Sequence, residues 1–199
     1  MLKNKHNEMP FVVKKTVSGI KPFLIMLFIA MLLAWVPIVF ASIVVLDFEL
    51  NDLTLHEDSR HSQYNENAPN ATEIARTATL APLLRKTLQT NHTIDVINVP
   101  QVHYLEADQG FGYLYSHPAK AAELGKSVNA EWIAVNRLHK PSFLFAYLIT
   151  HLVHVPSGHQ MPEIIIEIKG QQSNMNDRGI NKLAGQINHQ IQRSKSDEQ

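Results

Sequence analysis

The sequence predicts a single α/β domain with a mixed sheet that ends in an antiparallel meander. Strand and helix patterns alternate over the first half of the chain, and three strand patterns with short connections precede a last helix. The expected order is β-α-β-α-β-β-β-α, a two-layer or three-layer sandwich. Of the 199 residues, about 150 remain for this domain once an N-terminal targeting segment is set aside. We place the domain at residues 42–193.

Residues 1–41 have the pattern of a targeting segment. Five lysines and a single acid, Glu8, precede an apolar run from Phe23 to Ala41. A lysine-bearing start, an apolar stretch ended by Pro37 and a small-residue pattern predict a signal peptide cleaved between Ala41 and Ser42. The alternative is a retained membrane anchor over residues 22–41, since about 20 apolar residues cross a bilayer. Both place the domain across the membrane from the cytoplasm, in the periplasm.

Composition excludes several classes of function. The chain has no cysteine, which excludes disulfides, thiolate metal sites and a lipid-modified cysteine. The lysine-rich start leaves the rest of the chain mildly acidic, which argues against a nucleic-acid partner or an anionic membrane surface.

The first strand is expected to begin near Ser42. Strict alternation would place the even-numbered apolar residues from Val44 to Leu50 on one face of this strand, and Ile43 and Val45 on the other. A strand that is apolar on both faces is typical of the middle of a covered sheet.

Helix signals follow a polar loop. Asn70 with Glu73 three residues later predicts a helix start. Pro82 then predicts either a kink or a second helix that Thr79 caps. A strand is expected at Thr93–Val99.

The second half of the chain begins with a short helix from Pro118 to about residue 128. Strands are predicted at 130–140, 143–155 and 163–170, with a tight turn at 156–158. In the last of these, alternation predicts that Ile164, Ile166 and Ile168 share a buried face. A last helix is expected from Asp177, with one apolar stripe, and residues 194–199 as a disordered tail.

The segments "VVLDFELND", "TIDVINV" and "AELGKSVNAEWIAVNRLHK" resemble the N-terminal domain of TolB and related CsgG-type envelope domains. The segments "VLDFEL", "AEWIAVNRLHKPSFLF" and "EIIIEIKGQQSN" are more closely similar to a family of exported bacterial proteins known only as a domain of unknown function. That resemblance covers nearly all of residues 42–196. It implies a fold and an envelope setting, and it implies no reaction or cofactor.

A loop is expected between the second strand and the helix at Pro118, and four aromatic residues lie in it: Tyr104, Phe111, Tyr113 and Tyr115. Tyrosine offers a large contact area at a small entropic cost, so these residues are candidates for binding a partner protein. The alternative is that their rings cover the sheet.

An acidic and histidine-containing stretch follows the first strand. Asp52, His56, Glu57 and His61 are weak candidates for a divalent metal site, because their spacing does not place two imidazoles on one helical face. The alternative is a strand end that becomes polar where it reaches water.

We therefore expect a non-catalytic, exported accessory module that binds an envelope protein. The sequence contains no recognisable catalytic motif, and no cofactor is expected. The alternative is a periplasmic protein that binds a small ligand or a divalent metal.

Overall fold

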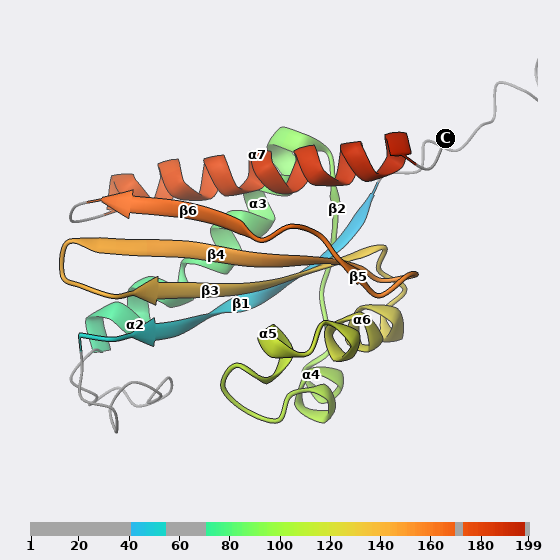
Figure 1. Cartoon of the computed structure of the whole chain (residues 1–199), viewed down its shortest axis with the longest axis horizontal. Coiled ribbons are helices and arrows are strands. Elements are labelled where there is room, and N and C mark those ends of the chain that lie inside the picture. The colour runs from blue at the N-terminus through green and yellow to red at the C-terminus, as the bar shows by residue number, and fades with distance from the viewer. Residues whose placement is uncertain (1–40, 55–70, 170–172, 198–199) are drawn as a thin grey trace, which may run out of the picture. The chain divides into compact units, whose positions relative to one another are not determined.

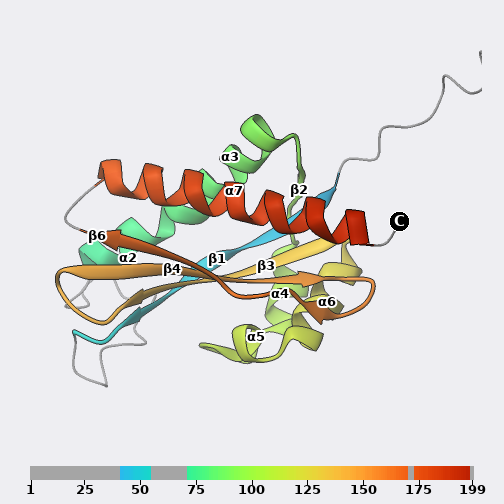
Figure 2. The same cartoon turned by 45° about the horizontal axis from the view of Figure 1, so that its top comes forward.

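The computed structural model describes residues 41–54, 71–169 and 173–197. These form a mixed α/β domain in which a sheet lies between two layers of helices (Figures 1 and 2). Over the described residues the sheet has six strands in the order β2-β1-β3-β4-β5, with β6 also paired to β4. The predicted α/β class and mixed sheet are confirmed. Residues 1–40 of the predicted targeting segment and the candidate metal ligands His56, Glu57 and His61 lie outside the described residues.

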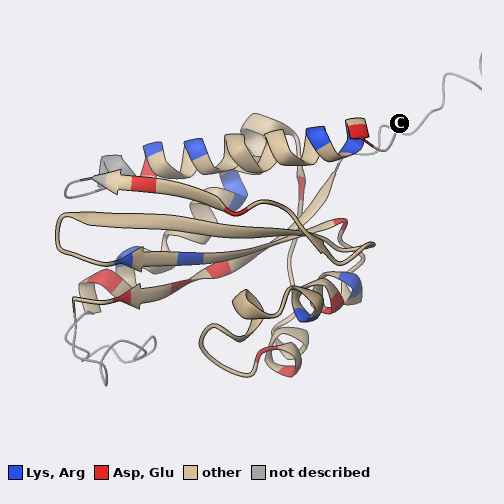
Figure 3. Cartoon of the chain, in the orientation of Figure 1, with Lys and Arg blue, Asp and Glu red and all other residues tan. Residues whose placement is uncertain are grey.

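Strand β1 (Ser42–Asp52) lies in the interior of the sheet, parallel to β2 (Asp95–Ile97) on one side and to β3 (Trp132–Lys140) on the other. It starts at the predicted residue. Opposite charges face each other across the β1–β3 pair, with Glu49 opposite Arg137 and Asp52 opposite Lys140. Figure 3 shows these as red and blue segments on neighbouring strands. Such cross-strand pairs help to fix the register.

The predicted alternation along β1 is wrong beyond Leu46. The β1–β3 register shifts between Val45 and Phe48, so one extra residue is accommodated in β1. Val44 and Leu46 therefore pack on one face of the sheet, whereas Phe48 packs on the other with Val45. A bulge of this kind moves every later side chain to the opposite face.

Polar side chains satisfy the backbone at this bulge. Asn136 is fully buried and donates to the Leu46 carbonyl oxygen at 2.8 Å, and it accepts from the Thr150 hydroxyl at 2.7 Å. Arg85 donates to the Val45 carbonyl oxygen at 2.7 Å through Nη2. The carbonyls that the bulge removes from regular strand pairing thus keep hydrogen-bond partners.

Helices α2 (Ala71–Ala78) and α3 (Leu80–His92) connect β1 to β2 on one face of the sheet. The chain breaks into two helices at Thr79, with Pro82 in the first turn of α3, which is one of the two predicted arrangements. The Thr79 side chain makes no cap hydrogen bond to α3, and its hydroxyl donates to the Arg76 carbonyl oxygen at 2.7 Å.

Three short helices connect β2 to β3 on the opposite face (Figure 2): α4 (Gln101–Ala107), α5 (Tyr113–Ser116) and α6 (Pro118–Ser127). The first two lie in the aromatic segment, where the sequence predicted a loop. Both are shorter than the 11 to 18 residues over which hydrophobic periodicity is read. Strand β2 is likewise shorter than the predicted Thr93–Val99.

The antiparallel part comprises β4 (Phe145–His154), the two-residue β5 (His159–Gln160) and β6 (Ile164–Lys169). Residues 155–158 form the predicted turn, in which Gly158 has φ +67°. In β6 the isoleucines at 164, 166 and 168 are buried, as the alternation predicted.

Helix α7 (Ser173–Asp197) covers the same face as α3. Its predicted apolar stripe is fully buried: Ile180, Leu183, Ala184, Ile187 and Ile191. The helix continues to Asp197, so the chain is still helical at 194–197, where the sequence predicted a disordered tail. Over the part of the chain that the structure describes, no helix is both long and apolar enough to span a bilayer.

Candidate functional site

The four predicted aromatic residues lie on and between α4 and α5. Tyr104, Tyr113 and Tyr115 are partly buried against the smaller core cluster under α4–α6, whereas Phe111 is 38% exposed. The three tyrosines therefore help to cover this face of the sheet. Their predicted role in partner binding stays a prediction.

Tyr115 is the centre of a polar and aromatic cluster at the border of this smaller core. Its hydroxyl donates to Glu163 Oε1 at 2.8 Å, and its ring stacks on His151 with 3.9 Å between centroids. The Arg137 guanidinium carbon lies 3.7 Å from the centroid of the same ring. Residues from α5, β3 and β4 and the residue before β6 are thus joined through one side chain.

His151 connects α5 to the β6 end of the sheet. Its Nδ1 lies 3.0 Å from the Tyr115 carbonyl oxygen, and its Nε2 lies 2.8 Å from Glu163 Oε1. Both partners are hydrogen-bond acceptors when Glu163 is ionised, so only the doubly protonated imidazolium donates to both. That form also makes an ion pair with Glu163.

Glu49 fixes the other side of the cluster. Its Oε2 accepts from Arg137 Nη2 at 2.8 Å and its Oε1 accepts from the Gly112 amide at 2.7 Å. Gly112 has φ +77°, and a Cβ there would lie 3.0 Å from Arg137 Nη2. Glycine at this position thus permits both the left-handed backbone and the close approach of the guanidinium group.

The cluster sets the protonation of two of its members. Burial and the hydrogen bond to Glu163 raise the pKa of the Tyr115 hydroxyl, which therefore stays protonated at neutral pH. Burial alone would raise the pKa of the Glu163 carboxyl, but the hydrogen bonds from His151 and Tyr115 outweigh it, and the pKa lies below its ordinary value. The cluster therefore holds α5 against the sheet.

Beyond this cluster, the sheet and the β3–β4 hairpin expose apolar side chains. Phe143, Leu144 and Phe145 are consecutive and are 79%, 71% and 39% exposed, and Ile165 of β6 is 55% exposed. We call residues 141–145 the hairpin tip. The sequence analysis began the strand at residue 143, two residues before β4 begins, and missed this surface. The signal that could have identified it is the apolar triplet directly after Pro141 and Ser142, at the turn between two strands.

A cleft of about 350 Å³ lies beside the hairpin tip. Phe143, Phe145 and Ile168 line it on the apolar side, with Arg76 and Lys140 on the polar side. The Lys140 ammonium nitrogen lies 5.7 Å from the centroid of the Phe143 ring. The tip is therefore an apolar surface with charged groups at its border.

Of the predicted metal ligands, the structure describes Asp52 alone. This residue is 1% exposed, and its Oδ1 accepts from the Thr54 amide at 3.0 Å while Oδ2 accepts from Lys140 Nζ at 3.1 Å. The lysine thus occupies the position beside this carboxylate where a cation would bind. Within the described ranges no group of three metal-ligating residues is found.

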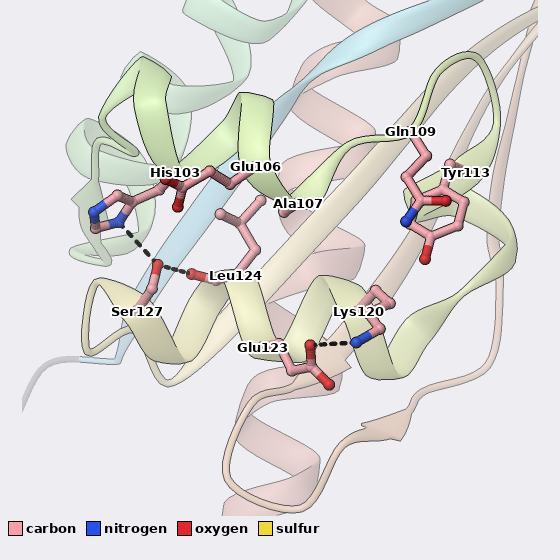
Figure 4. A pocket seen from close by; sticks show the side chains of 9 residues that line it. All are labelled: His103, Glu106, Ala107, Gln109, Tyr113, Lys120, Glu123, Leu124 and Ser127. Atoms are coloured by element: carbon pink, nitrogen blue, oxygen red, sulfur yellow. Dashed lines mark hydrogen bonds and ion pairs between the residues drawn. The ribbon is translucent and has the colours of Figure 1, made fainter.

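A hollow of about 270 Å³ lies between α4 and α6 (Figure 4). It contains a histidine beside a serine, with 3.1 Å between His103 Nδ1 and Ser127 Oγ. The Ser127 hydroxyl donates to the Leu124 carbonyl oxygen at 2.8 Å, so His103 faces the oxygen as a donor and does not receive its proton. The pair therefore joins the two helices and does not have the geometry of an activated nucleophile.

Comparison with solved structures gives matches of low identity. An NMR structure of Escherichia coli LpoB is 15% identical over 67% of this chain, with a TM-score of 0.43, and the match spans 59% of LpoB. The PelC dodecamer from Paraburkholderia phytofirmans is 15% identical over 74% of this chain and 83% of its own, with a TM-score of 0.43. Lipoprotein GNA1162 from Neisseria meningitidis is 13% identical over 74% of this chain and 96% of its own, also with a TM-score of 0.43.

None of these three structures is a TolB or CsgG domain, so that part of the predicted resemblance stays a prediction. No protein of curated function matches the sequence. The model of a protein family of unknown function, DUF3280 (DUF2380), matches residues 41–187 and confirms the other part of the resemblance. The chain therefore belongs to this family of proteins of unknown function.

Proposed function

We propose that this chain is a non-catalytic accessory module of the bacterial envelope, exported to the periplasm, that binds another envelope protein through its hairpin tip. One observation carries the proposal, namely three consecutive large apolar side chains exposed at the tip. Contiguous exposed apolar surface marks interaction sites in soluble domains. Phe143 and Leu144, both more than two-thirds exposed, are the expected anchors.

The base of the tip is a regularly paired hairpin, which suits recognition. Strands β3 and β4 pair from Trp132 opposite His154 to His139 opposite Tyr147, directly below the tip. At the tip, the Leu144 amide donates to Ser142 Oγ at 3.3 Å. A preorganised surface loses little conformational entropy when a partner binds. The neighbouring cleft can accept an apolar side chain of the partner in return.

The position of the tip fits an exported protein. Ser42 lies at one end of β1, and Asp52 at the other end pairs with Lys140 beside the tip. Eleven strand residues separate these ends by roughly 35 Å. A domain held at its N-terminus would therefore present the tip at its far end. Export itself is proposed on the lysine-rich start and the apolar run of residues 1–41.

Ala41, the residue before the expected cleavage site, is part of the fold. Its side chain is 5% exposed within the main core, and its carbonyl oxygen accepts from the Asp95 amide at 2.9 Å. Cleavage after Ala41 would remove both contacts. The mass of the mature chain shows directly whether cleavage occurs after Ala41.

The test of the proposal uses site-specific photo-crosslinking in living cells that produce the full chain. A photoreactive phenylalanine at position 143 is expected to give a discrete adduct, whose partner is identified by mass spectrometry. The adduct should be lost when Leu144→Ser is added, and the melting temperature should stay unchanged because both positions are exposed.

Helix α4 offers a matched control. Val102 and Leu105 are 56% and 65% exposed, so they are apolar and accessible but lie away from the tip. A photoreactive group at position 102, and the variant Leu105→Ser, should leave the partner adduct at 143 unaffected. No adduct at 143, or an adduct that survives Leu144→Ser, would contradict the proposal.

A further inference from the structure

Helix α5 is a small element that side chains hold against the sheet. It has four residues, and a helix of that length is not stable on its own. Gly110 and Gly112 precede it with φ +113° and +77°, and α6 begins at Pro118, two residues after α5 ends. Figure 1 shows α5 at the end of a loop on the α4–α6 side of the sheet. Residues 108–117, which we call the α5 segment, can therefore move about the glycines when the contacts that hold them weaken.

One proton decides whether His151 can hold this segment. Its Nδ1 lies 3.0 Å from the Tyr115 carbonyl oxygen and its Nε2 lies 2.8 Å from Glu163 Oε1. A neutral imidazole has one N–H donor and one lone pair, so it can donate to one of these two acceptors only. Its lone pair then faces the other oxygen at hydrogen-bond distance. Loss of the proton therefore turns one of the two attractive contacts into a repulsive one.

The other members of the cluster keep their charge near neutral pH. Burial and the hydrogen bond to Glu163 raise the pKa of the Tyr115 hydroxyl. Burial alone would raise the pKa of Glu163, but the hydrogen bonds from His151 and Tyr115 bring it below its ordinary value. Arg137 of β3 stays protonated and forms an ion pair with Glu49 of β1 at 2.8 Å. Histidine is the side chain type whose charge changes between about pH 5 and 8, so His151 is the member that responds to pH in this range.

We propose that the α5 segment is a pH-dependent latch, which protonated His151 holds closed against the sheet and which opens more often as the pH rises from about 5 to 8. Opening uncovers Leu114, which is 3% exposed in the closed form. The main core under α3 and α7 lies on the other face of the sheet, so the rest of the fold stays intact. The inference goes beyond the proposed function and does not rest on it, because no residue of the hairpin tip takes part.

A second histidine, at the end of the α5 segment, offers a matched control. His117 Nδ1 lies 2.7 Å from the Tyr113 carbonyl oxygen, and the two rings stack with 4.4 Å between centroids. A neutral imidazole with its hydrogen on Nδ1 makes this contact. The bond between His117 and Tyr113 therefore survives the loss of a proton, unlike the pair of contacts at His151.

Hydrogen exchange of the purified full chain at about pH 5.5 and about pH 7.5 tests the latch. The Ser116 amide, which donates to the Gly112 carbonyl oxygen at 3.0 Å, reports on the α5 segment, and the amides around Leu183 in α7 report on the whole fold. After correction for intrinsic exchange, the protection of Ser116 should fall roughly fivefold at the higher pH, as expected for the loss of about one hydrogen bond. The protection of α7 should stay constant. An unchanged Ser116, or an equal fall in α7, would overturn the inference.

Two substitutions should remove the pH dependence with opposite results. His151→Gln cannot take up a proton, and its one amide nitrogen cannot donate on both sides, so the protection of Ser116 should be low at both pH values. Glu163→Gln provides an N–H donor for the neutral imidazole, whose own N–H then donates to the Tyr115 carbonyl oxygen, so the protection should be high at both. His117→Gln should keep the wild-type fall. A wild-type fall in His151→Gln, or low protection of Glu163→Gln at the higher pH, would contradict the assignment of the switch to this pair.

Discussion

Helices cover the two faces of the sheet to different extents. On the face under α3 and α7, apolar side chains from every long strand form one continuous core that the helices seal. On the face under α4–α6, a smaller core covers one half, and the other half passes into the Tyr115 cluster and then into exposed side chains. The first face therefore provides most of the stability, and the second, which we call the open face, leaves Ile165 of β6 exposed.

Two substitutions, one on each face, test this difference with the largest expected effect. Leu183→Ala in α7 removes a fully buried side chain and should cost about 2–5 kcal/mol of unfolding free energy, because it leaves a cavity. Ile165→Ala in β6 should change it by less than about 0.5 kcal/mol. Urea unfolding of the full chain measures both. Similar costs at the two positions would show that the open face also carries core packing.

The next effect concerns the polar network within the sealed face. Asn136→Ala leaves the Leu46 carbonyl and the Thr150 hydroxyl without their partner in the core. Unsatisfied buried groups should cost about 1–3 kcal/mol. Adding Thr150→Val removes one of the two orphaned groups and should recover part of the loss. A double variant less stable than Asn136→Ala would contradict this account of the network.

Prediction from sequence succeeds where burial follows a regular spacing. Hydrophobic periodicity located the first strand, the buried isoleucines of β6 and the stripe of α7, because burial on one face repeats at a fixed spacing. It did not detect the bulge at Val45–Phe48. A bulge changes the face of every later residue while the composition stays apolar, and its stabilising contacts come from Asn136 and Arg85, far away in the chain.

The candidate site could be predicted only in part. The aromatic segment was identified from its composition, but its anchoring through Glu49, His151 and Glu163 depends on three strands meeting in space. The apolar hairpin tip was not predicted, because Phe143 and Leu144 precede β4 directly and belong to the same apolar run. The run was therefore assigned to the strand from its first residue. Local pattern alone does not show where a strand stops being covered.

A third prediction addresses how α5 is held on the open face. Gly112→Ala must adopt φ +77° and approach Arg137 Nη2 at 3.0 Å, so it should cost about 1–2 kcal/mol for the backbone alone, plus the displacement of the arginine. Gly158→Ala is the matched control, since its φ is +67° and nothing lies within 4 Å of the added Cβ. Equal losses in thermal unfolding would show that the close approach to Arg137 does not matter.

The smallest expected effect is a pH dependence of stability that comes from Glu163 on the open face. The pKa of Glu163 is lowered in the folded chain, so its contribution to stability is present above the ordinary value of 4.5 and is lost as the pH falls through the lower folded value. The side chain is 39% exposed, so solvent screens the interaction and the effect should be modest.

Unfolding curves from pH 6 down to the acid limit measure this contribution by comparing the full chain with Glu163→Gln. Wild type should lose more stability than the variant below about pH 4.5, because only wild type must protonate a carboxylate that Tyr115 and His151 hold. Tyr115→Phe removes one of the two hydrogen bonds to the Glu163 carboxylate. In that background, the difference in acid-induced loss of stability between the chain with Glu163 and the Glu163→Gln variant should be smaller. Parallel curves for wild type and Glu163→Gln would mean that the cluster fastens α5 through Glu49 and Arg137, with no contribution from the Glu163 carboxylate.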